Sequence, residues 1–131
     1  MSTCPADLLH WASTTFAAND QCEVTARACI SRAYYSSLHG AKESFNIAIN
    51  PDQPSSHNAV IDALARKSSA PGQGRSTAIT MVKLLPKLKR LRVKADYSLN
   101  EDIVADDVKR ALSTAKVVLD CCAEAQRLRR T

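Results

Sequence analysis

The sequence predicts an all-α fold, a compact antiparallel bundle of about five helices, and three observations support that class. Apolar residues recur at the spacing of helix faces, and no segment shows the strict alternation of a half-buried strand. Aromatic residues are only 5% of the chain, so the core must be mostly alanine, leucine, valine and isoleucine, which favours helix-on-helix packing. The length suits one domain, so we expect residues 1–131 to share a single core.

The first two helices are predicted on either side of a polar break at 19–20. Pro5 is suited to the first position of a helix, and the apolar spacing that follows predicts a helix over about 5–18. The second helix is predicted to be long, over about 21–46, because this stretch contains no proline and a single glycine. The polar, proline-containing residues 50–56 then indicate a loop.

Three further helices complete the predicted bundle. Either serine of the 55–56 pair can cap a short helix that ends near Lys67, and the segment SSAPGQGRS then forms the main loop. A helix over about 76–97 contains Pro86, which can bend it. The last helix, over about 104–128, begins with two aspartates and ends in arginines, as the helix dipole favours, and carries a continuous apolar stripe.

Several classes of site are excluded by composition. The five cysteines are an odd number and none forms a C-x-x-C pair, so we expect free thiols and neither a disulfide framework nor a zinc site. The Gly-x-Gly of the main loop lacks the lysine and the preceding strand of a phosphate loop. We therefore expect no metal and no cofactor. Because no stretch of 18 apolar residues and no basic leader are visible, we expect a cytoplasmic protein outside the membrane.

Positive charge is concentrated in the predicted fourth helix and at the C-terminus, within a net charge of +5. The candidate RNA contacts in the helix are Lys83, Lys87, Lys89, Arg90 and Lys94. The C-terminal cluster is Arg127, Arg129 and Arg130. Such patches attract phosphate backbones or acidic partners. A solvated helix face with a frayed basic tail would have the same composition, so both interpretations stay open.

The predicted second helix has an apolar side and a polar side. At about 100° per residue, its expected core face carries Ile30, Tyr34, Leu38, Ala41 and Phe45. The opposite side carries Arg32, Ser36, His39 and Glu43 within about 60° of one another, with Tyr35 near their edge. Any surface helix has a polar stripe, so an ordinary solvated face is one interpretation of this pattern.

The other interpretation of the polar stripe is a phosphate site. Arg32 and His39 are two helical turns apart, a rise of about 10 Å, and the long arginine side chain would let both groups address one phosphate. Glu43 follows His39 by four residues, so its carboxylate can hold or charge the imidazole.

Three segments occur in an informative order, ISRAYYSSLHGAKESF at 30–45, SSHNAVIDAL at 55–64 and RLRVKADYSL at 90–99. Over about 30–125 the chain resembles the HEPN superfamily of small helical bundles, especially its minimal single-domain bacterial members. This resemblance implies a bundle that dimerises and, in catalytic members, cuts RNA without a metal. Those members carry an arginine, four to six residues and then a histidine at a cleft between two protomers. They commonly act as toxins or in phage defence, often beside a nucleotidyltransferase antitoxin.

On this resemblance, Arg32 and His39, with six residues between them, are the candidate catalytic pair. In metal-independent RNA cleavage His39 would handle a proton and Arg32 would stabilise charge on the phosphoryl oxygens. Two copies across a homodimer would supply both the base and the acid.

Further candidates lie on the later segments. Arg92 and Asp96 are four residues apart and can form a structural salt bridge; alternatively Arg92 faces the cleft, oriented by Asp96, while Tyr97 donates to phosphate. His57 resembles the histidine of the family's S-x-H element, and capping or packing is its other interpretation. The supporting candidates are Tyr35, Ser36, Glu43 and His57.

Two functions follow, from different classes. The first is a metal-independent endoribonuclease that acts as a toxin or phage-defence effector. The second is a non-catalytic HEPN module that binds nucleic acid, a nucleotide or a partner protein such as a nucleotidyltransferase antitoxin. The second is motivated by the histidines, because all three lie at or before position 57 and none follows Arg92. A helical protein with no relation to RNA is a third possibility.

Overall fold

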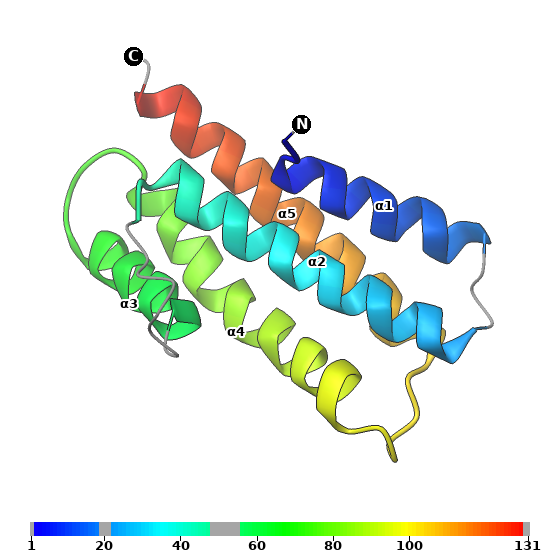
Figure 1. Cartoon of the computed structure of the whole chain (residues 1–131). Helices are drawn as coiled ribbons and strands as arrows, with labels where there is room; N and C mark the ends of the chain where they lie inside the picture. The colour runs from blue at the N-terminus through cyan, green and yellow to red at the C-terminus, as the bar shows by residue number, and fades with distance from the viewer. Residues whose placement is uncertain (1, 19–21, 48–55, 130–131) are drawn as a thin grey trace.

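The computed structural model describes residues 2–18, 22–47 and 56–129. Its helices are α1 (Pro5–Ala18), α2 (Glu23–Ser44), α3 (Ser56–Ser69), α4 (Arg75–Tyr97) and α5 (Ala105–Arg129). No strand occurs within these ranges, and the helices form one compact bundle in which α1 and α2, like α4 and α5, run antiparallel (Figure 1). The predicted fold class is therefore confirmed. The break predicted at 19–20, residues 50–55 of the loop predicted at 50–56, and Arg130 lie outside the described residues.

Two glycines shape the turn that leads into α4. Gly72 has φ of 138° and Gly74 has φ of 84°, and both values favour glycine over residues with a Cβ atom. Gly74 is the N-cap residue of α4, and its carbonyl oxygen accepts a hydrogen bond from the Ala78 amide at 2.9 Å. The Gly-x-Gly of the sequence thus serves a sharp turn. After it, α4 continues as one helix through Pro86.

Helix α2 is the central element, packed against α1, α4 and α5 (Figure 1). Small residues on several of its sides are buried, including Ala33, Ser37 and Gly40. A Cβ atom on Gly40 would lie only 2.8 Å from Leu119 Cδ2 and 3.2 Å from Cys122 Sγ, both on α5. The two helices therefore approach closely because position 40 has no side chain.

The burial of α2 corrects one sequence-based prediction. Ser36 was expected on a polar, outward face, but it is fully buried and its hydroxyl donates to the Pro5 carbonyl oxygen at 2.8 Å. The reason is that the start of α1 covers this part of α2. Arg32, His39 and Glu43 remain exposed, so the polar stripe is interrupted at its centre.

The end of α4 is fastened to the start of α2 by Arg27. Its guanidinium donates to the carbonyl oxygens of Lys94, Ala95 and Ser98, at 3.2, 3.0 and 3.3 Å. They lie at the end of the helix, where backbone donors are few; the Lys94 and Ser98 oxygens also accept from the backbone amides of Ser98 and Glu101, at 3.1 and 3.0 Å. The contact fixes the last turn of α4, from which Tyr97 projects.

Within the described ranges, no helix has the length and apolar character needed to cross a membrane. The same residues contain no group of three histidine, cysteine, aspartate or glutamate side chains that could hold a metal ion. All five cysteines are unpaired, and Cys29 and Cys122 are buried.

Candidate functional site

Aromatic and cationic side chains gather where α2, the first turn of α3 and the second half of α4 meet. The His57 ring on α3 stacks on Tyr34 of α2, with ring centroids 5.5 Å apart and an interplanar angle of 9°. It also meets Tyr35 edge-on at 5.8 Å. From α4, the Arg92 Cζ atom lies 5.2 Å from the centroid of Tyr34 and 5.8 Å from that of Tyr35. We call these four side chains the Tyr35 cluster.

His57 is held by a hydrogen bond at its Nδ1 atom, which lies 2.8 Å from the Tyr34 hydroxyl oxygen. Burial raises the pKa of Tyr34 to about 12, so this hydroxyl keeps its proton. Burial, and then the positive charges of Arg92, Lys89 and His39, lower the pKa of His57. In the neutral tautomer that carries its proton on Nε2, His57 accepts a hydrogen bond from the Tyr34 hydroxyl at Nδ1.

Arg92 is buried beneath the cluster, with 8% of its side chain exposed. It faces Asp96 at 3.5 Å, and the Ser31 hydroxyl donates to the same carboxylate at 3.4 Å. Burial disfavours the guanidinium charge, but the facing tyrosines, a hydrogen bond to Tyr97 and the Asp96 carboxylate outweigh it and raise the pKa of Arg92. Its buried Nε has no hydrogen-bond partner. The Arg92–Asp96 pair is thus present as a salt bridge, and it also places Arg92 in the cluster.

The candidate catalytic pair lies at the rim of this cluster. Arg32 and His39 are both exposed, and both contact the half-buried ring of Tyr35. The Arg32 Cζ atom lies 5.1 Å from the ring centroid, and the His39 centroid lies 6.5 Å from it with a tilt of 36°. The two groups thus share one aromatic ring at the surface, with Arg92 behind it.

The remaining candidates, Tyr97, Glu43 and Ser36, differ in whether they contact the cluster. Tyr97 is 72% exposed, and its ring centroid lies 5.6 Å from the Arg92 Cζ atom. Glu43 is exposed, and no hydrogen bond or ion pair joins it to His39 within the described chain. Ser36 faces α1 and takes no part.

Among the basic candidates on α4, Lys83 is exposed and the other four divide between two faces. Lys89 points toward α3, where its Nζ donates to the Asn58 side-chain oxygen at 3.2 Å, one residue from His57. Lys87, Arg90 and Lys94 instead line an open groove between α4 and α5. Sequence reasoning treated these residues as one patch, and it missed Arg110 of α5, which lines the same groove.

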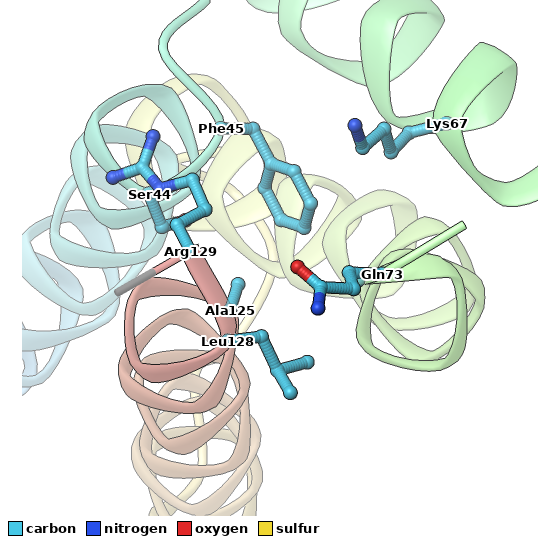
Figure 2. A pocket seen from close by; sticks show the side chains of 8 residues that line it. Ser44, Phe45, Lys67, Gln73, Ala125, Leu128 and Arg129 are labelled. Carbon is cyan, nitrogen blue, oxygen red and sulfur yellow. The ribbon is translucent and has the colours of Figure 1, made fainter. Parts of the chain in front are cut away.

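A small pocket lies at the other end of the bundle, around the C-terminal end of α2. Phe45 points into it, Lys67 and Gln73 approach from α3 and the following turn, and Leu128 and Arg129 close it from the end of α5 (Figure 2). Its volume of about 60 Å³ holds a few water molecules, not a nucleotide. Apart from Arg129 of the C-terminal basic cluster, it contains none of the candidate residues.

Comparison of the chain with protein-family models, with curated proteins and with solved structures finds no match.

Proposed function

We propose that the protein is a metal-independent endoribonuclease of the HEPN type, in which Arg32 and His39 act on one phosphate of an RNA chain. The proposal is carried by the placement of these two exposed side chains on the ring of Tyr35. Arg92 lies behind that ring and adds positive potential at the same place. Arginine and histidine together supply charge stabilisation and proton transfer, the two requirements of this reaction.

The reaction begins when a neutral His39 accepts the proton of a ribose 2′-hydroxyl. The 2′ oxygen forms a bond to the adjacent phosphorus, and the bond from phosphorus to the 5′ oxygen of the next nucleotide breaks. A protonated His39 of the partner subunit donates its proton to that leaving oxygen. The products are a 2′,3′-cyclic phosphate and a 5′-hydroxyl. Arg32 donates to the phosphoryl oxygens as their charge increases.

The need for two proton carriers supports a homodimer as the active form. Each chain offers one exposed histidine at the cluster, His39, because His57 is half-buried and its Nδ1 is held by Tyr34. On the HEPN resemblance, the cellular role we propose is that of a toxin or phage-defence effector in the cytoplasm. An antitoxin encoded nearby, such as a nucleotidyltransferase, is the proposed partner.

The experiment is incubation of the purified protein with total RNA in excess EDTA, beside variants His39→Ala and Arg32→Ala. Loss of a positioned proton carrier lowers the rate by about 10²- to 10⁴-fold. Loss of a donor that stabilises developing charge lowers it by about 10²- to 10³-fold, so both variants should be nearly silent. His10→Ala is the matched control, because His10 is exposed on α1 and lies outside the cluster. Cleavage that survives both substitutions would refute the assignment of these residues.

The second candidate function is a non-catalytic HEPN module that binds nucleic acid, a nucleotide or a partner protein. It is favoured by the presence of only one exposed histidine at the Tyr35 cluster, His39, and by the absence of any histidine after Arg92 in the sequence. Co-expression with the neighbouring gene product, followed by size-exclusion chromatography, separates the two. A stable heterocomplex without cleavage supports the module, whereas a homodimer that cuts RNA excludes it.

A further inference from the structure

A groove on the far side of α4 from the Tyr35 cluster is lined by three of the seven basic residues of that helix. It is open, has a volume of about 490 Å³, and lies between α4 and α5. The charged residues that line it are Lys87, Arg90, Lys94, Asp107 and Arg110. Four cations thus face one carboxylate, which leaves the groove with three net positive charges.

The groove and the Tyr35 cluster lie on opposite sides of the same helix. With 3.6 residues per turn, Lys87, Arg90 and Lys94 project roughly 140–160° away from Arg92 around the α4 axis. Arg92 turns inward to α2, whereas Lys87 and Arg90 are exposed. The two basic surfaces are therefore separate sites, about one helix diameter apart, or roughly 10 Å.

Asp107 organises the floor of the groove. Its side chain is 5% exposed, and its oxygens accept from Lys94 at 3.4 Å, from Arg110 at 2.5 Å and from the Val104 amide at 3.1 Å. This buried carboxylate draws a cation from each wall toward the groove. The Arg110 side chain remains 66% exposed, so its guanidinium still presents hydrogen-bond donors to a ligand.

We propose that this groove binds the sugar-phosphate backbone of RNA at a site separate from the Tyr35 cluster. The choice of RNA as occupant rests on the proposed function. An open groove with three net charges and an arginine on each wall suits a polyanionic strand that passes through it, because phosphate contacts hold such a strand without reading its sequence.

Tyr97 lies on the surface that joins the groove to the cluster. It follows Arg90 by seven residues and is therefore nearly in line with it along α4. Its exposed ring also reaches the Arg92 Cζ atom at 5.6 Å. A strand held in the groove passes over Tyr97 to reach Arg32 and His39. The groove thus positions RNA and the cluster acts on it.

The test measures binding of a fluorescent, unstructured RNA of about 20 nucleotides, longer than one single-strand binding site. The parent protein is His39→Ala in EDTA, so that the RNA remains intact. The groove variant adds Lys87→Gln, Arg90→Gln and Arg110→Gln. Loss of three phosphate contacts should make the negative slope of log affinity against log salt less steep by about 2. Between 50 and 200 mM salt, the parent's affinity should then fall roughly 20-fold more than the variant's.

A second triple variant controls for net charge. Arg66→Gln, Lys67→Gln and Lys116→Gln remove three exposed positive charges outside the groove. This variant should keep the salt slope of the parent. Equal weakening by both triple variants, or unchanged binding by the groove variant, would overturn the proposal. Circular dichroism melts establish that each variant is folded.

Failure of this proposal can be told apart from failure of the proposed function. If the groove variant loses RNA binding but the unsubstituted protein never cuts RNA, the groove site stands and the nuclease does not. If the unsubstituted protein cuts RNA and the three groove substitutions, made without His39→Ala, leave KM for a long RNA unchanged, the nuclease stands and the groove site does not.

Discussion

Replacing Tyr34 with phenylalanine removes the hydroxyl that holds His57 and keeps the aromatic ring in the core. The ring of Tyr34 is fully buried, and its hydroxyl oxygen lies 2.8 Å from His57 Nδ1. A typical hydrogen bond contributes about 0.5–1.5 kcal/mol, and a buried partner left unsatisfied costs about 1–3 kcal/mol. Because His57 is only half-buried, water can partly replace the lost partner. We expect a loss of about 1–1.5 kcal/mol in the free energy of unfolding.

The assay is urea denaturation followed by circular dichroism, with Tyr35→Phe as the matched control on the same helix. Tyr35 is half-buried, and its hydroxyl makes no hydrogen bond to any described residue, so its removal should change stability by less than about 0.5 kcal/mol. In a thermal melt the Tyr34 variant should unfold about 4 °C lower. Equal effects of the two substitutions would show that the Tyr34–His57 bond does not hold the start of α3.

Three other predictions follow from contacts of His57, Gly40 and Asp107. The lowered pKa of His57 means that the folded protein binds a proton at this side chain less readily than the unfolded chain does. The free energy of unfolding should therefore decrease as pH falls below about 6.5. Urea titrations at neutral and mildly acidic pH should show this loss, and His57→Gln should reduce it. Gly40→Val should cost about 1–3 kcal/mol in the same assay, since a Cβ atom at this position would lie 2.8 Å from Leu119 Cδ2. Asp107→Ala should cost about 1–2 kcal/mol, because this carboxylate in the first turn of α5 accepts from the Val104 amide just before the helix, and its removal leaves that amide without its side-chain partner; an effect below about 0.5 kcal/mol would contradict that role.

The helices could be predicted from the sequence because their signals are local. Periodic apolar residues and helix-end residues lie close together in the chain, and the acidic first turn of α5 is present as predicted. The inward face of α2 was also predicted from spacing: Ile30, Tyr34 and Ala41 are fully buried, and Leu38 is nearly so. None of these inferences needed knowledge of which helix packs against which.

What could not be predicted depends on the packing partners of each face. Ser36 was assigned to solvent because its neighbours on the wheel are charged, but α1 covers it. The signal available was the abundance of small residues around α2, including Ala33, Ser37 and Gly40, which is typical of a helix packed on several sides. Tyr34 was treated as core alone, and its bond to His57 joins residues 23 positions apart.

The sequence predicted which residues belong to the candidate site better than it predicted how they are arranged. Spacing placed Arg32 and His39 on one face, but it could not show that Tyr35 lies between them. The basic run of α4 was read as one patch, because composition does not record that Lys89 faces α3 whereas Arg90 faces the groove. Arg110 was missed because only the approach of α5 to α4 brings it there.

The central claim is that Arg32 and His39 act together on one phosphate, and a double-mutant cycle on cleavage tests it most directly. Single-turnover rates on one defined RNA in EDTA are measured for the unsubstituted protein, His39→Ala, Arg32→Ala and the double variant. Residues that act as a unit are strongly non-additive, so the double variant should be no slower than the slower single variant. The unsubstituted protein should leave 2′,3′-cyclic phosphate ends. Independent, multiplicative losses, or cleavage that survives the double substitution, would contradict the claim.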